Sequence, residues 1–257
     1  MHGLLDEFNN TFCLDVGDDA YLSLANMKLR YQVWCLENDY FNPADFDEAI
    51  ESDEYDSRSI YAVVSNKNHN INIATTRVIL HDKNKPKTKF PMEKFTMLRR
   101  HERDHLLHAP RETIGEISRF CVSKNFRRRA AEKKTTHGIT PSDETPQASG
   151  KRSFSQITLG LFRGIFSICL QYNLDHLYAF MEPALLRIIR RYGVNFTPVG
   201  PCVNYYGLRQ PCILSIISAK ENAKKTSKEV YDFVCSEQNT TPLQTRFANT
   251  SNNALSN

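Results

Sequence analysis

The sequence predicts a single α/β domain in which a mixed central sheet carries helices on both faces. Helix-like and strand-like stretches follow one another as helix, antiparallel hairpin, central strand, helix, strand, helix and two closing strands, and one layered sheet accommodates this order. The chain has 257 residues, of which 40% are hydrophobic and 11% aromatic, an ordinary composition for a globular protein. We assign the domain to residues 1–235, with a flexible basic insertion at 123–153, and we expect a disordered tail at 236–257.

The first predicted helix lies in "DDAYLSLANMKLRYQVWCLE", where apolar residues recur at three- and four-residue spacings. On the helical wheel Arg30 lies within about 60° of both Met27 and Trp34, so it borders the buried stripe. Its guanidinium therefore either points into a cleft or extends along the surface to water.

Two strands, "SIYAVV" and "INIATTRVIL", flank the polar turn "SNKNHN" and predict an antiparallel hairpin. Arg77 shares one face of the second strand with isoleucines. The central strand, "ETIGEISRFCV", also carries charge on both faces, because alternation places Ile114, Glu116, Ser118, Phe120 and Val122 on one side and Gly115, Ile117, Arg119 and Cys121 on the other.

The segment "KNFRRRAAEKK", residues 124–134, opens the insertion and holds six basic side chains against Glu132. Such a patch attracts nucleic acid, anionic lipid or an acidic protein, unless it is a solvated loop that binds nothing. A helix follows in "SFSQITLGLFRGIFSICLQY", then the strand "HLYAFM" and the helix "EPALLRIIRRYG", with Pro183 near its start and Gly193 just past its end. The segments "NFTPVG" and "PCILSIIS" are predicted as the closing strands.

Two observations bear on the cellular location. No run approaches the roughly 18 apolar residues of a membrane span, and "MHGLLDEFNN" lacks the features of a signal peptide, so we expect a soluble, cytoplasmic protein.

The seven cysteines are scattered without a C-x-x-C pair, which favours reduced core thiols over disulfides or a thiolate metal site.

Charged residues on packed elements suggest a functional cleft. Ionised groups are costly to bury unless they are paired, so these side chains predict a shared polar network beside a cleft. An ion-pair network with a purely structural role is the alternative. The candidates come from four separate stretches: Arg30, the pair Asp53 and Asp56 in "ESDEYD", Arg77, and Glu116 with Arg119.

The stretches "KLRYQVW", "ESDEYD", "TTRV" and "GEISRFCV" resemble the successive motifs of the acyl-homoserine lactone (autoinducer) synthases and the related N-acyl amino acid synthases. The resemblance covers about residues 20–123 and weakens through 154–200. It implies a GNAT-type fold and transfer of a fatty acyl group from acyl carrier protein to a small amine. By position it implies that Glu116 and Arg119 are catalytic and that substrate is bound by Arg30, Trp34, Tyr40, Asp53, Asp56, Arg77, Ser118 and Phe120.

Two differences from the lactone synthases indicate which branch of the family this chain resembles. Where the lactone synthases have a tryptophan this chain has Tyr40, which favours an amino acid or similar amine as acceptor over S-adenosylmethionine, the acceptor of a lactone synthase. The long insertion is similar to that of the larger acyltransferases associated with the PEP-CTERM/exosortase system.

The acyl donor implied by the resemblance is the acyl-phosphopantetheine of acyl carrier protein, with no permanently bound cofactor. GNAT enzymes that use coenzyme A have a glycine-rich turn after the central strand, where this chain has no glycine before Gly138. We expect the basic loop to dock the acidic carrier protein through Lys124, Arg127, Arg128 and Arg129.

The acceptor amine must lose a proton before it attacks a thioester, and Glu116 is the candidate base. Partial burial would raise its pKa, while Arg119 or Arg77 would oppose that shift. The alternative is that Glu116 only pairs with the arginines. We also expect the acyl chain to lie in an apolar tunnel under the helix of residues 154–172 and the strand "HLYAFM", where large residues at small positions such as Gly160 or Ala179 should shift chain-length preference. Ordinary core packing of this helix is the alternative.

Two other function classes remain as alternatives. "HERDH" matches the H-E-x-x-H zinc motif through His101, Glu102 and His105, but charged residues fill the intervening positions, so a zinc hydrolase is a remote alternative and we expect no metal. No nucleic-acid-binding motif accompanies the basic loop, so we expect no nucleic-acid partner, and peripheral membrane contact is the remaining use of that charge.

Overall fold

The computed structural model describes residues 3–95, 109–126 and 148–235. Its strands are β1 Phe12–Gly17, β2 Ser59–Asn66, β3 Ile71–Ile79, β4 Ile114–Val122, β5 His176–Met181, β6 Thr197–Pro198, β7 Val203–Asn204 and β8 Leu208–Ser215. Its α-helices are α1 Leu4–Thr11, α2 Ala20–Arg30, α3 Pro91–Phe95, α5 Ala148–Gln171, α6 Pro183–Arg190, α7 Ile216–Thr226 and α8 Lys228–Cys235.

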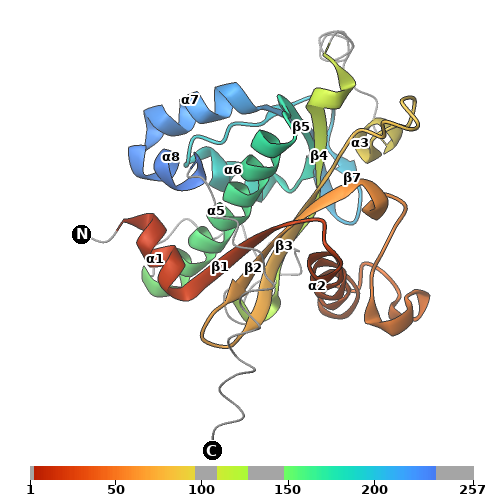
Figure 1. The fold of residues 1–257 in the computed structure, drawn as a ribbon, viewed down its shortest axis with the longest axis horizontal. Helices are drawn as coiled ribbons and strands as arrows, with labels where there is room; N and C mark the ends of the chain where they lie inside the picture. The colour runs from red at the N-terminus through yellow and green to blue at the C-terminus, as the bar shows by residue number, and fades with distance from the viewer. Residues whose placement is uncertain (1–2, 96–108, 127–147, 236–257) are drawn as a thin grey trace, which may run out of the picture.

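The strands form one mixed sheet in the order β1-β2-β3-β4-β5-β8-β6, and β7 pairs with β8 outside this path. All of its pairs are antiparallel except β4 with β5, which are parallel. Helices α1, α5 and α8 lie together on one side of the sheet, whereas α2 packs against β2 and β3 from the other side (Figure 1). The predicted mixed sheet with helices on both faces is confirmed.

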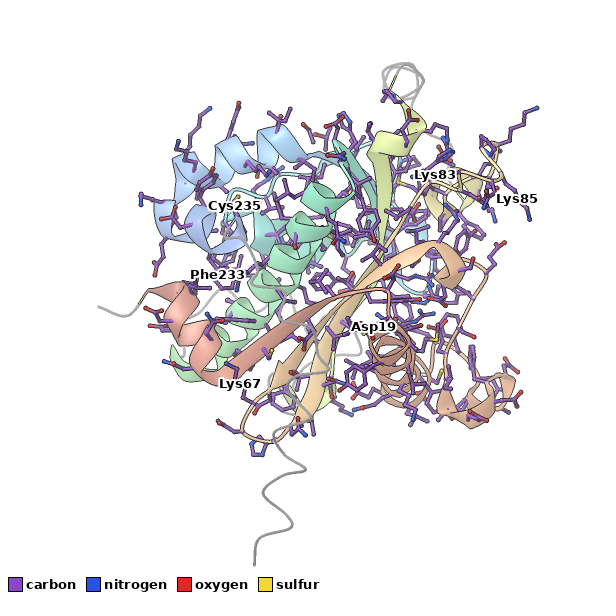
Figure 2. All side chains as sticks on the ribbon, viewed as in Figure 1. Asp19, Lys67, Lys83, Lys85, Phe233 and Cys235 are labelled. Carbon is purple, nitrogen blue, oxygen red and sulfur yellow. The ribbon has the colours of Figure 1, made fainter. Side chains whose placement is uncertain are left out.

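Helix α2 has a side-chain cap at its N-terminus and continues into a π-helix at its C-terminus. The Asp19 side chain, labelled in Figure 2, accepts a hydrogen bond from the Leu22 backbone N–H at 3.0 Å. From Tyr31 to Glu37 the helix continues as a π-helix, a geometry that is frequent near functional sites. Arg30, at the junction, has no exposed surface, so its guanidinium points inward rather than along the surface to water.

The main core lies between α5 and the sheet and depends on two close approaches. A Cβ placed on Gly160 would lie 2.5 Å from the Phe8 ring of α1, and one on Gly164 would lie 2.7 Å from Ala62 of β2. The glycines thus let α5 approach its neighbours. Gly160 faces the Phe8 ring, and the acyl tunnel beside it stays a prediction.

Several boundaries differ from the sequence-based expectation. Helix α5 begins at Ala148, inside the segment predicted as an insertion to residue 153. Strand β8 ends at Ser215, three residues before the predicted end, because the Ser215 hydroxyl accepts from the Ser218 backbone N–H and starts α7. Only Thr197–Pro198 of "NFTPVG" forms a strand. Six elements were not predicted: α1, β1, α3, β7, α7 and α8. The predicted tail lies outside the described residues.

The cysteines are free thiols, as predicted, and Cys35, Cys121, Cys169 and Cys212 are buried. Within the described ranges, none of the helices is both long enough and apolar enough to cross a membrane.

We predict that Gly164→Ala destabilises the protein. Helix propensity alone would favour alanine by about 1 kcal/mol, but the new methyl group would overlap Ala62, and overpacking of this kind costs about 1–3 kcal/mol. Urea unfolding measures the change. Gly3→Ala is the control, since nothing lies within 4 Å of its added Cβ. A Gly164→Ala protein as stable as wild type would show that α5 is not held this closely to the sheet.

Candidate active site

Strand β4 contains a bulge that decides which side chains reach the site. Arg77 of β3 pairs with Ser118, but Thr75 pairs with Cys121, so β4 has one more residue than β3 over this interval. Arg119 lies inside it with φ of 52°. The extra residue shifts the alternation of side chains along β4 by one position. Arg119 therefore lies on the same face of the sheet as Glu116.

The bulge also moves Phe120 away from Glu116. Phe120 is 6% exposed and packs against Phe162 of α5, with 5.7 Å between ring centroids. It belongs to the main core on the opposite side of the sheet from Glu116. The prediction that the two residues share a face is therefore wrong, because strand alternation does not survive the extra residue, and Phe120 does not line the pocket described below.

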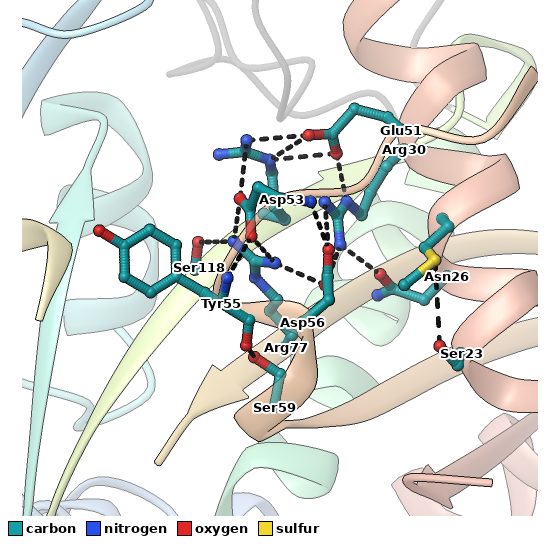
Figure 3. Close-up of polar contacts among 12 residues, drawn as sticks. Ser23, Asn26, Arg30, Glu51, Asp53, Tyr55, Asp56, Ser59, Arg77 and Ser118 are labelled. Carbon is teal, nitrogen blue, oxygen red and sulfur yellow. Dashed lines mark hydrogen bonds and ion pairs between the residues drawn. The ribbon is translucent and has the colours of Figure 1, made fainter. Parts of the chain in front are cut away.

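Arg30 and Arg77 are joined through carboxylates that follow α2 in the chain (Figure 3). Arg30 donates to Asp56 at 2.6 Å, to Asn26 at 3.1 Å and to Glu51. Arg77 donates to both oxygens of Asp53, at 2.7 and 2.6 Å, and to Asp56 at 2.5 Å. Asp56 thus accepts from both guanidinium groups.

Arg119 completes the network from β4. It donates to Glu51 at 2.9 Å and to Asp53 at 3.2 Å. Its guanidinium carbon also lies 5.2 Å from the ring centroids of Trp34 and Phe41, a distance at which cation–π attraction operates.

The network balances three guanidinium groups with three carboxylates. Burial alone would favour the neutral acids, but Arg119 and Arg30 lower the pKa of Glu51 to about 2. Burial likewise opposes ionisation of Asp53, yet the hydrogen bonds and charge of Arg77 keep its pKa well below the usual range. Sequence reasoning singled out Asp53 and Asp56 but missed Glu51, although it is the first residue of the quoted "ESDEYD".

Glu116 stands apart from these pairs. Its side chain is buried, at 2% exposure, and accepts a hydrogen bond from the Met92 backbone N–H at 3.0 Å. Burial raises its pKa to about 8, and the opposing effects of the Met92 N–H, Arg77 and Arg58 are smaller. Among the described residues its hydrogen-bond partner is thus a backbone N–H, whereas Arg77 and Arg119 are paired with other carboxylates.

A pocket opens where β4 and β5 separate. The parallel ladder ends at the pair of Ile117 and Ala179, although β4 continues to Val122 and β5 to Met181. The pocket encloses about 440 Å³, part of it open to solvent. Of the predicted site residues, those that line it are Trp34, Asp53, Arg77, Glu116, Ser118 and Arg119.

Other predicted residues lie behind this lining. Arg30 and Asp56 do not line the pocket, but they belong to the ion-pair network that holds its arginines and carboxylates in place. Tyr40 packs on Trp34 with 5.5 Å between ring centroids. Sequence reasoning did not assign six lining residues to the site: Tyr55, Pro91, Ile117, Phe180, Tyr205 and Arg209. Tyr55 and Ile117 lie within the motifs "ESDEYD" and "GEISRFCV", and Phe180 lies in the predicted strand "HLYAFM".

The remaining predicted residues concern binding of carrier protein or metal. Lys124 is exposed, and its backbone N–H donates to Glu37 at 2.8 Å. Arg127, Arg128 and Arg129 lie outside the described residues, as does the "HERDH" motif. Over residues 3–95, 109–126 and 148–235, no cluster of three or more histidine, cysteine or acidic side chains could hold a metal ion.

Comparison with known proteins agrees with this architecture. Residues 29–137 match the family described as an acetyltransferase (GNAT) domain. The acyl-homoserine lactone synthase LasI is similar, with a TM-score of 0.52, 19% identity, and coverage of 88% of this chain and 98% of that one. No curated protein sequence gives a significant match.

Two further structures have the same fold. The coenzyme A-dependent lactone synthase BjaI, solved with S-adenosylmethionine and isopentyl-CoA, has a TM-score of 0.55 and 13% identity, covering 85% of this chain and 89% of that one. FeeM, an N-acyl amino acid synthase from uncultured soil microbes, has a TM-score of 0.51 and 11% identity, covering 84% and 96%. The chain has the GNAT fold, and its residues 29–137 match an acetyltransferase domain of that type.

We predict that Glu51→Gln strongly destabilises the fold. The change leaves Arg30 and Arg119 buried with one carboxylate fewer, and breaking a buried ion pair from one side costs about 3–5 kcal/mol. The free energy of unfolding in urea measures it. Glu54→Gln is the matched control, because Glu54 is 68% exposed in its ion pair with Lys94 and exposed pairs contribute about 0–1 kcal/mol. Equal small losses in both variants would contradict the prediction.

Proposed function

We propose that this protein is an N-acyltransferase that moves a fatty acyl group from acyl carrier protein to the amine of an amino acid or a similar small molecule. The observation that carries the proposal is Glu116, a carboxyl group with a raised pKa that lines the pocket and has no arginine partner among the described residues. The acids of the network are held ionised by guanidinium groups, so they are poor bases.

The chemistry assigned to Glu116 is proton removal. The acceptor enters as an ammonium ion, gives one proton to the Glu116 carboxylate, and its nitrogen forms a bond with the thioester carbonyl carbon. The carbon–sulfur bond then breaks, the carrier thiol leaves with a proton, and an amide remains. A base with a pKa near 8 is well matched to this task near neutral pH.

The separation of β4 from β5 gives the donor a path to Glu116. Beyond Ile117 and Ala179 the two strands no longer pair, so a thioester arm can lie between them. Backbone N–H groups of β4 that face this opening would stabilise the oxyanion as the amine attacks.

Arg77 and Arg119 have a positioning role in this proposal. Both are held by two carboxylates each, which fixes their guanidinium groups beside the pocket. Their positive charge also favours the ionised form of Glu116 when an ammonium ion arrives. Trp34 provides an apolar wall next to Arg119.

The acceptor class is decided by product analysis. Mass spectrometry of lipid extracts from cells that express the protein, compared with an empty-vector control, is expected to reveal a new N-acyl amino acid. An acyl-homoserine lactone would instead make S-adenosylmethionine the acceptor.

We predict that Glu116→Gln keeps the fold but lowers turnover by about a hundredfold or more, the usual contribution of a general base. Because the base must be deprotonated, wild-type kcat/KM should rise with pH up to about 8, and the variant should lack this limb. Steady-state rates between pH 6 and 9 test this. A folded variant with near-normal turnover removes Glu116 from the role of base.

We predict that reversing Arg127, Arg128 and Arg129 to glutamate raises the KM for acyl carrier protein severalfold. A basic patch speeds encounter with an acidic partner, and salt weakens this effect. The rate with a short acyl-thioester mimic should stay nearly unchanged, which separates a docking defect from a folding defect. Wild-type KM for the carrier protein at low salt, or equal use of acyl-CoA by the wild type, would overturn the choice of donor.

A further inference from the structure

Arg209, on β8, lines the pocket and is not part of the three-arginine network. The residue is 4% exposed. Its Nη1 forms an ion pair with Glu182 at 3.0 Å and a hydrogen bond to the Leu208 carbonyl at 3.3 Å. Its Nη2 is buried and has no hydrogen-bond partner among the described residues. Both Arg209 and Glu116 line the same pocket.

Arg209 differs from the other arginines of the pocket in its terminal nitrogens. Arg77 also has an unpaired buried nitrogen, Nε, but both of its Nη atoms donate to carboxylates. Arg77 and Arg119 each contact two carboxylates, whereas Glu182 is the single carboxylate that Arg209 contacts among the described residues. A buried donor left unsatisfied costs about 1–3 kcal/mol, and more for a charged group. A guanidinium with one arm held by protein and the other buried and unpaired is suited to an anionic ligand, especially a carboxylate.

The hairpin of β7 and β8 holds this guanidinium in place. A Cβ on Gly207, whose φ is +97°, would lie 3.1 Å from Arg209 Nη1 and 3.6 Å from Tyr40 Oη. Glycine therefore permits the turn to lie against the guanidinium. Tyr205 in the same turn stacks on Phe180 with 5.0 Å between ring centroids, and both line the pocket.

We propose that Arg209 binds the carboxylate of the acceptor, so that the acceptor is an α-amino acid held by its two charged groups. This inference rests on the proposed function. In an α-amino acid the ammonium and carboxylate groups share one carbon, so a single small pocket must provide both a base and a cation. Glu116 and Arg209 are these two groups, and Glu182 positions Arg209. A zwitterion also brings no net charge into a pocket whose arginines are already balanced.

The experiment compares pairs of acceptors. Each of the twenty standard amino acids is offered with a fatty acyl-carrier protein, and the best substrate is compared with its own primary amide, which lacks the carboxylate. Kinetic constants are measured for wild type, for Arg209→Gln, and for the double variant Arg209→Gln with Glu182→Gln. The double variant removes both buried charges, which avoids leaving Glu182 unpaired.

Arg163→Gln is the matched control, because Arg163 is also a buried arginine but lies on α5 and contacts Phe233. We expect it to leave both KM values of the wild type unchanged. In the Arg209 variants the KM for the amino acid should rise by about tenfold or more, as expected for loss of a charged hydrogen bond, and approach that for the amide. The KM for the acyl donor should not change, and kcat should change less than KM.

The outcomes separate this inference from the proposed function. A wild-type protein that acylates the amide as well as the free amino acid, or Arg209 variants that keep the wild-type preference, would overturn the role of Arg209 while leaving the acyltransferase intact. A raised KM for the donor instead of the acceptor would assign Arg209 to the phosphate of the pantetheine arm and overturn the inference. A wild-type protein that acylates no amine at all would overturn the proposed function itself.

Discussion

The ion-pair network of Arg30, Arg77 and Arg119 with Glu51, Asp53 and Asp56 is the interaction on which the rest of the site depends. It joins α2, the segment before β2, and strands β3 and β4. Taking six charges out of water would be prohibitive if any were unpaired, so the network permits one arrangement of these elements and disfavours others. Because these carboxylates pair with the arginines, Glu116 forms no ion pair within the described part of the chain, and its raised pKa follows from burial.

The bulge in β4 allows the network and Glu116 to serve one pocket. In a regular strand Glu116 and Arg119 would point to opposite sides of the sheet. The extra residue turns Arg119 toward Glu51 and sends Phe120 into the core beneath α5. The sheet is thereby divided into a side that packs α5 closely, through Gly164, and a side where charge and the pocket are concentrated.

The pocket is electrostatically asymmetric. Arg77 and Arg119 each pair with two carboxylates, whereas Arg209 has a single carboxylate partner and a buried unpaired donor in the part of the chain that the structure describes. Glu116 lies in the same lining and is protonated more readily than an ordinary glutamate. A substrate that carries both an amine and an anion complements these two groups, which is why the proposed acceptor is an amino acid rather than a simple amine.

The sequence by itself determined the fold class and most of the site's charged residues. The spacing of apolar residues predicted α2, the β2–β3 hairpin, β4 and α6. Each of these elements buries one face, so its pattern is visible within its own short stretch of sequence. Arg30, Arg77 and Glu116 were also identifiable, since a charge within an apolar pattern is visible locally, and Asp53 was identified within the acidic stretch "ESDEYD". Other features depended on contacts between distant segments: the bulge at Arg119, the pairing of Glu51, and the position of Arg209 beside Glu116. Only the tertiary structure decided these, because an extra residue in a strand and the burial of a guanidinium are set by partners that the neighbouring sequence does not contain.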